Sequence, residues 1–170
     1  MAVTNDQRLF LGGGDHARGT ITEVFERDSR IVFKVYGIES GVPPARIYSL
    51  TQGASGALLA GTADGLYAMT GETFKRVEVE NIPVGTRINQ VTVDGERTWL
   101  ATSRGLAIIQ GSEQRLLTKK DGLHSSLIKT VEYESSHTVW LSYGTSAGAT
   151  RVHLSNIEAV PELSHVGAEE

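Results

Sequence analysis

Residues 41–50 read GVPPARIYSL, and the plan of this stretch returns twice further along the chain. Residues 81–91 read NIPVGTRINQV and residues 121–131 read DGLHSSLIKTV, so the three stretches begin 40 residues apart. Alignment places one isoleucine of each stretch in the same apolar column: Ile47, Ile88 and Ile128. Self-similarity at a fixed period of tens of residues indicates an architecture built from one repeated supersecondary unit.

Each repeat continues with a turn and a second apolar segment. This segment reads LLAGT at 58–62, WLAT at 99–102 and WLSY at 140–143. In the first two repeats a Gly-Leu pair follows, at 65–66 and 105–106, which predicts a tight hairpin into a third segment. A more polar fourth segment closes the unit. Because β-branched alternation dominates and no helical period extends over about ten residues, the sequence predicts an all-β chain.

Four-stranded units of about 40 residues have the size of β-propeller blades, which stand radially around a central channel. The sequence therefore predicts a β-propeller with about three and a half to four blades. The expected divisions are a partial blade at 7–40, blades at 41–80, 81–120 and 121–158, and a tail or linker stub at 159–170. One large side chain of each unit is expected in the core between blades: Phe10, Leu59, Trp99 and Trp140.

The head of the chain fits the repeat less regularly than the rest. Phe10 and Leu59 are 49 residues apart, whereas the next two steps of that column are 40 and 41 residues. We therefore expect an insertion between Asp15 and Arg30, with TITEV and RIVFKV as the third and fourth strands of a blade that lacks its first strand.

Three short motifs in the first full repeat are characteristic: Gly41-Val-Pro43, GALLAGT at 56–62 and Gly65-Leu66. The next repeat keeps Ile82-Pro83, WLAT and Gly105-Leu106, and the third keeps only Gly122-Leu123 and Trp140-Leu141. This plan, over about residues 41–152, resembles the two-component regulator propeller repeats in the sensor regions of hybrid histidine kinases and related bacterial signalling proteins. The resemblance implies a non-catalytic, ligand-sensing segment in the periplasm or outside the cell.

Composition narrows the classes of partner. The 170 residues carry 16 Lys+Arg against 20 Asp+Glu, for a net charge of −4, without a basic run, which argues against nucleic-acid binding. The absence of cysteine excludes disulfides and thiolate metal sites, and it leaves the cytoplasm open as an alternative compartment. No apolar run reaches the roughly 18 residues of a membrane helix. The expected ligand is a small molecule or a glycan, and no cofactor is expected.

Two motifs invite a catalytic interpretation that their context does not support. GTSAG at 144–148 matches the nucleophile elbow of serine hydrolases, but it joins two predicted strands instead of a strand and a helix. GGGDH at 12–16 lacks the Gly-Lys-Ser/Thr of a phosphate loop. The five histidines do not have the spacing of a metal site, so none is predicted.

The repeat itself points to a binding site. The first strand of each blade lines the channel of a propeller. Cationic side chains at the beginning of these strands are therefore placed to contact an anionic ligand. Arg46 and Arg87 occupy the same position in successive units, and Lys129 lies two residues beyond that column, where Leu127 interrupts it. These three residues are the predicted ligand-binding set.

Two other functions remain open from the residues alone. A scaffold for protein partners would expose aromatic side chains, for which Tyr48, Tyr67 and Tyr143 are candidates. A propeller enzyme, a lyase or hydrolase, would assemble its site from distant loops. Because propellers close with about four to eight blades, and the family that the repeats resemble closes near seven, the sequence also predicts a fragment of a larger ring or self-association that completes one.

Overall fold

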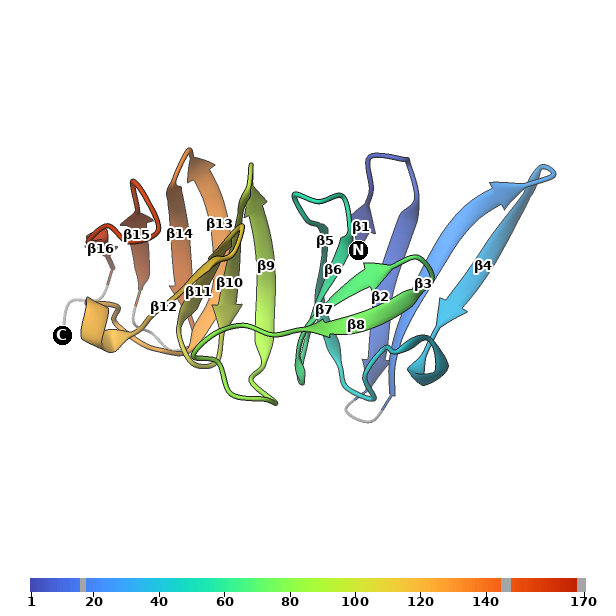
Figure 1. Cartoon of the computed structure of the whole chain (residues 1–170), viewed down its shortest axis with the longest axis horizontal. Coiled ribbons are helices and arrows are strands. Elements are labelled where there is room, and N and C mark those ends of the chain that lie inside the picture. The colour runs from blue at the N-terminus through green and yellow to red at the C-terminus, as the bar shows by residue number, and fades with distance from the viewer. Residues whose placement is uncertain (16–17, 145–147, 168–170) are drawn as a thin grey trace.

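The structure is a computed structural model that describes residues 1–15, 18–144 and 148–167. Its strands form four antiparallel sheets of four strands each, and each sheet consists of strands that are consecutive in the chain (Figure 1). We name the sheets blades 1 to 4. Blade 1 contains β1 (Ala2–Val3), β2 (Leu9–Asp15), β3 (Arg18–Arg27) and β4 (Arg30–Tyr36); blade 2 contains β5 (Ile47–Gln52), β6 (Leu58–Thr62), β7 (Gly65–Thr70) and β8 (Thr73–Val77).

Blades 3 and 4 repeat this order. Blade 3 contains β9 (Ile88–Asp94), β10 (Arg97–Thr102), β11 (Leu106–Gln110) and β12 (Glu113–Leu117). Blade 4 contains β13 (Ile128–Ser135), β14 (Thr138–Tyr143), β15 (Ala149–His153) and β16 (Glu162–Val166). Short 3₁₀ turns at Ile38–Ser40 and Lys119–Asp121 precede blades 2 and 4. The predicted all-β architecture of four-stranded blades is confirmed.

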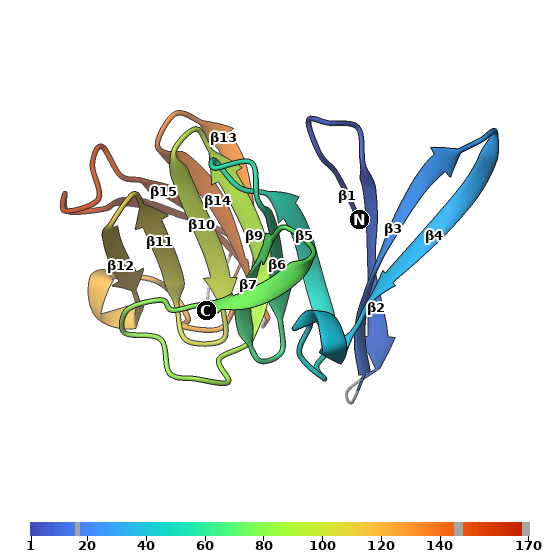
Figure 2. The same cartoon turned by 45° about the vertical axis from the view of Figure 1, so that its right-hand side comes forward.

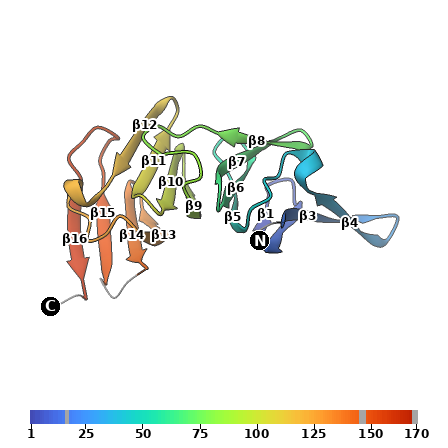
Figure 3. The same cartoon turned by 90° about the horizontal axis from the view of Figure 1, so that it is seen from below.

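The four blades spread as a half ring. In Figure 3 the first strands β1, β5, β9 and β13 gather towards one centre, while the fourth strands fan outward, with blades 1 and 4 on opposite sides. Figure 2 shows the same neighbours from another side, with β5 beside β9 and β9 beside β13. This arrangement places the first strands along the inner face.

The repeated hairpin follows from a repeated threonine. Thr62 is fully buried, and its hydroxyl donates to the Gly65 carbonyl at 2.9 Å while accepting from the Asp64 amide at 3.0 Å. Thr102 makes the same two bonds in blade 3, at 2.7 and 2.9 Å. Because Gly65 has a φ of 130°, which side chains with a Cβ rarely adopt, the glycine is required there.

The head of the chain differs in part from its prediction. Blade 1 does have a first strand, β1, in which Ala2 pairs with Phe10, but two residues are too few to make a sequence pattern. TITEV and RIVFKV lie in β3 and β4 as expected. The extra residues of this unit lengthen β2 to seven residues and β3 to ten residues, against five or six in the corresponding strands of the other blades.

The end of the chain differs as well. Residues 159–170 are expected to form a tail, yet Glu162–Val166 is β16, which pairs with all of β15. Leu163 of this strand packs against the core between blades 3 and 4. Most side chains of this strand are exposed, and its polar, acidic composition therefore did not predict a strand. Only the pairing with β15 defines it.

Candidate functional site

Strands β5, β9 and β13 present equivalent positions along the inner face. The carbonyls that precede them accept equivalent backbone bonds: Ala63 donates to Arg46, Ser103 to Arg87, and Gly144 to Leu127, at 2.9, 3.0 and 3.3 Å. Arg46 and Arg87 therefore share one structural position, and Leu127 occupies it in blade 4. This geometry agrees with the interrupted cationic column that the sequence alignment indicates.

A groove of about 430 Å³ crosses these three strands. Most residues that line it stand one or two positions after the isoleucine of the repeat in each strand, so they form two rows across the strands. The first row is Tyr48, Asn89 and Lys129; the second is Ser49, Gln90 and Thr130. Met1 and Leu50 complete the lining.

The second row mainly holds the inner strands together. The first strand of each blade is a sheet edge, which leaves backbone groups without ladder partners. The Ser49 hydroxyl accepts from the Val91 amide at 3.1 Å, and the Gln90 side chain accepts from the Val131 amide at 3.3 Å while donating to Glu132 at 2.8 Å. Side chains of one blade thus bridge to the edge of its neighbour.

The first row contains two exposed side chains, Tyr48 and Lys129, whereas the Asn89 amide also bridges two blades by donating to the Ile128 carbonyl at 2.6 Å. Tyr48 is 37% exposed, and both predicted arginines lie over its ring, with guanidinium carbons 5.6 Å (Arg46) and 5.9 Å (Arg87) from the ring centroid. The structure therefore brings the two arginines together at one aromatic ring, although 41 residues separate them in the sequence.

Lys129 lies at the other end of the same groove, on β13. Arg46 and Lys129 are exposed, and Arg87 is half-buried with its Nε buried and without a hydrogen-bond partner. Among residues 1–15, 18–144 and 148–167, no ion pair neutralises any of these three cations. The groove thus combines uncompensated positive charge with an aromatic face and amide groups.

Sequence reasoning did not identify Asn89, Gln90 and Thr130, and it considered Tyr48 only for a protein-binding surface. The signal was available, because these residues stand one and two positions after Ile47, Ile88 and Ile128. The position relative to these isoleucines determines which side chains of an inner strand face the channel. It can be used to find the site only once the first strands are known to lie side by side.

Three residues of the predicted core column are buried or half-buried between blades. Phe10 and Trp99 are 1% and 0% exposed in cores shared with the next blade, and Leu59 is half-buried against a cluster that includes residues of blade 3. Trp140 differs: blade 4 is the last of the sheets in the described residues, and the Trp140 side chain is partly exposed.

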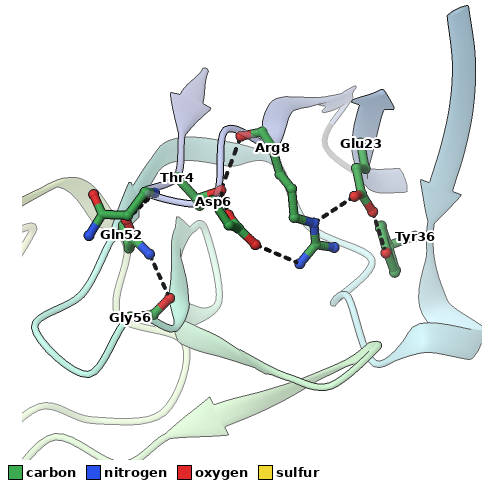
Figure 4. A network of polar contacts seen from close by, with 8 residues as sticks. Thr4, Asp6, Arg8, Glu23, Tyr36, Gln52 and Gly56 are labelled. Carbon is green, nitrogen blue, oxygen red and sulfur yellow. Dashed lines mark hydrogen bonds and ion pairs between the residues drawn. The ribbon is translucent and has the colours of Figure 1, made fainter. Parts of the chain in front are cut away.

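A second polar cluster lies between blades 1 and 2 (Figure 4). The Glu23 carboxylate, on β3, is 6% exposed and accepts from Arg8 at 2.6 Å and from the Tyr36 hydroxyl at 2.7 Å. The Arg8 hydrogen bond holds the pKa of Glu23 below its ordinary value. Both oxygens of this carboxylate already have partners within blade 1, so the cluster stabilises the side of blade 1 that packs against blade 2.

Key residues of the two catalytic-looking motifs are not among those that the structure describes. GTSAG has its central residues 145–147, including Ser146, outside the described residues, and His16 of GGGDH also lies outside them. Within the described part of the chain, no group of three or more His, Asp or Glu residues could hold a metal ion. Among residues 1–15, 18–144 and 148–167, no helix is long and apolar enough to cross a membrane.

Solved structures share this arrangement. The extracellular domain of the putative hybrid two-component system BT4673 from B. thetaiotaomicron matches with a TM-score of 0.68 and 19% identity, over 99% of this chain and 22% of that one. The extracellular domain of BT3049 from the same organism matches with a TM-score of 0.63 and 21% identity, over 78% of this chain and 20% of that one. Virginiamycin B lyase from Staphylococcus aureus matches with a TM-score of 0.73 and 13% identity, over 97% and 53%.

The fold is that of a β-propeller. No family model matches the sequence, and no curated protein matches it either. The chain spans about a fifth of the two extracellular domains and about half of the lyase. Two of these propeller neighbours are extracellular domains of putative hybrid two-component systems, which is consistent with the two-component regulator propeller repeats that the sequence resembles.

Proposed function

We propose that this chain is a non-catalytic, ligand-sensing propeller segment of a bacterial signal-transduction protein, acting in the periplasm or outside the cell. The resemblance of its repeats and the extracellular domains among its structural neighbours support this role. The signalling output belongs to other parts of the protein, and the segment itself needs no cofactor.

The observation that carries the proposal is the groove across β5, β9 and β13. Lys129 lines this groove, and Arg46 and Arg87 lie beside it at the Tyr48 ring. Charge-assisted hydrogen bonds from such cations to an anion are among the stronger polar contacts in proteins. The Tyr48 ring and the Asn89 amide suit a flat, hydroxyl-rich molecule. The ligand class that fits this set is an acidic small molecule or an acidic glycan.

Binding there connects to signalling through the blades. Because the groove walls come from three blades, a ligand that bridges them favours one relative placement of the inner strands over others. A ligand shifts such an equilibrium by its differential affinity for the two states. The groove is therefore positioned to convert occupancy into a change in blade arrangement.

The test is a binding experiment with matched acidic and neutral probes. Oligogalacturonate is expected to raise the Tm, and a neutral cello-oligosaccharide of equal length is not. The double variant Arg46→Ala, Arg87→Ala is expected to weaken binding at least about tenfold, since each charge-assisted bond contributes about 1.5–3 kcal/mol. Arg27→Ala, Arg30→Ala, which removes two exposed charges from the β3–β4 hairpin, is the control. Unchanged affinity in the first variant would overturn the assignment of the groove.

A further inference from the structure

The joint between blades 2 and 3 departs from the repeat on both of its sides. On one side, blade 2 provides the half-buried Leu59, where blades 1 and 3 provide Phe10 and Trp99 at 1% and 0% exposure. A cavity of about 420 Å³ lies beside Leu59, within the range of about 300–1,000 Å³ that is typical of small-molecule sites. The smaller side chain thus goes together with a space large enough for a ligand.

On the other side, blade 3 has a polar residue where the neighbouring blades have apolar ones. The residue directly before the large one on the second strand faces the preceding blade. In blade 2 this residue is Leu58, which packs in one cluster with Phe10. In blade 4 it is Val139, which packs in one cluster with Trp99. In blade 3 the same position holds Thr98, which lines the cavity.

The Thr98 hydroxyl is a buried polar group without a partner. The residue is 8% exposed, and within the described parts of the chain its side chain makes no hydrogen bond. The buried hydroxyls of Thr62 and Thr102, by contrast, each bond to a glycine carbonyl of their own hairpin. Because buried polar groups in folded proteins are nearly always hydrogen-bonded, an unpartnered hydroxyl in a cavity wall indicates that a polar group of another molecule enters the cavity.

The rest of the cavity lining is mainly apolar. Leu66 and Val77 of blade 2 and Ile109 of blade 3 line it, and Ile109 pairs directly with Thr98 across the strands. The exposed residues of the lining lie in turns, and the charged residue among them is Glu96. An apolar space with one hydroxyl in its wall and a carboxylate in an exposed turn favours a neutral molecule over an anion.

We propose that this cavity, the 2–3 joint cavity, binds a small, flat, neutral molecule that carries one N–H or O–H group. The apolar body of this molecule fills the space that the rings of Phe10 and Trp99 fill at the other two joints, and its polar group bonds to the Thr98 hydroxyl. The cavity shares no lining residue with the groove across β5, β9 and β13, and the cations of that groove select a different class of ligand. This site is therefore separate from the one proposed above.

The test is an NMR titration with indole and with indene, a molecule of the same shape that lacks the N–H group. Indole is expected to shift the methyl resonances of Leu66, Val77 and Ile109, and indene is expected to bind about two- to tenfold more weakly, as the loss of one hydrogen bond predicts. Thr98→Val keeps the shape of the side chain, removes the hydroxyl and is expected to abolish the preference for indole. A parent that binds neither probe or binds both equally, or a Thr98→Val variant that keeps the preference, would overturn the proposal.

A second variant locates the bound probe. Leu59→Phe places a ring in the cavity and is expected to block both probes in a folded chain, because Phe10 occupies the equivalent position of blade 1. The double variant Arg46→Ala, Arg87→Ala is the matched control, since neither arginine lines the cavity, and it should bind indole as the parent does. Circular dichroism verifies that each variant is folded, and Thr98→Val alone decides the test if Leu59→Phe does not fold. Indole binding that persists in folded Leu59→Phe, or that is lost in the arginine variant, would overturn the proposal.

Discussion

The joint between blades 2 and 3 and the joint between blades 3 and 4 are built on the same plan and packed differently. Trp99 is fully buried between blades 3 and 4, in a cluster with Ile128 and Leu141. Leu59 takes the same position between blades 2 and 3, and a cavity of about 420 Å³ lined by Leu59, Leu66 and other residues remains beside it. The larger side chain thus occupies a fully buried position, whereas the smaller one lies beside a pocket.

Polar bonds strengthen the same difference. Between blades 3 and 4, the buried Arg97 guanidinium donates to the Leu154 carbonyl at 2.8 Å, and Arg115 donates to the Ile157 carbonyl at 2.9 Å. Burial lowers the pKa of Arg97, and these bonds offset the cost of burying it. Between blades 2 and 3 the contact at the outer edge is a bond from the Glu80 amide to Gln114 at 2.7 Å. At their outer edges, the 3–4 joint therefore has arginine-to-carbonyl bonds that the 2–3 joint lacks among the described residues.

The largest expected effect is at Trp99. Trp99→Ala removes a fully buried side chain from the filled joint and is expected to cost about 3–5 kcal/mol of unfolding free energy. Leu59→Ala, at the open joint, should cost clearly less, because Leu59 is only half-buried. Urea unfolding of both variants measures the difference, and equal losses would contradict the comparison.

The open joint is still closely packed near the channel. A Cβ on Gly61 would lie 3.0 Å from Cγ2 of Ile88 and 3.2 Å from Cγ2 of Val91. Gly61→Val is therefore expected to destabilise the chain by about 1–3 kcal/mol through overpacking. Gly37→Val is the control, since its backbone φ is −126° and no atom lies within 4 Å of its added Cβ. If both variants melt alike, the inner strands are less closely packed than the structure describes.

A third variant fills the open joint. Leu59→Phe adds volume towards the cavity and copies the residue that Phe10 provides between blades 1 and 2. The expected gain is about 0.5–2 kcal/mol, as for other cavity-filling substitutions. The same unfolding measurement checks it, and a loss of stability would show that the cavity does not accept a ring.

The smallest expected effect concerns the joint between blades 1 and 2 and its dependence on pH. Because the pKa of Glu23 is held below its ordinary value of 4.5, its stabilising contribution is complete above that pH and is lost as the pH falls through the folded-state pKa. Glu23→Gln is therefore expected to be less stable at pH 7 and to lose less stability on acidification than the parent. Melting from pH 7 to pH 3 tests this, with the exposed Glu39→Gln as control. A parental pH dependence in Glu23→Gln would exclude the carboxylate as its source.

Residue spacing predicted much of the fold and part of the site. The 40-residue period and the isoleucine column located three blades, and the same alignment singled out Arg46 and Arg87. It missed β1 and β16, because a two-residue strand and an exposed strand leave little periodicity. It missed Asn89 because a polar residue on a half-exposed strand carries no signal of its own until its neighbours are known.

The sequence by itself determined the repeated unit, since alternation, hairpin glycines and buried threonines act over a few residues within one blade. Only the tertiary structure decided how the units meet. It placed Arg46 and Arg87 at the Tyr48 ring, left the cavity beside Leu59 and kept Trp140 partly exposed. These features depend on contacts between residues about 40 positions apart, where packing between blades, and not local backbone preference, sets the geometry.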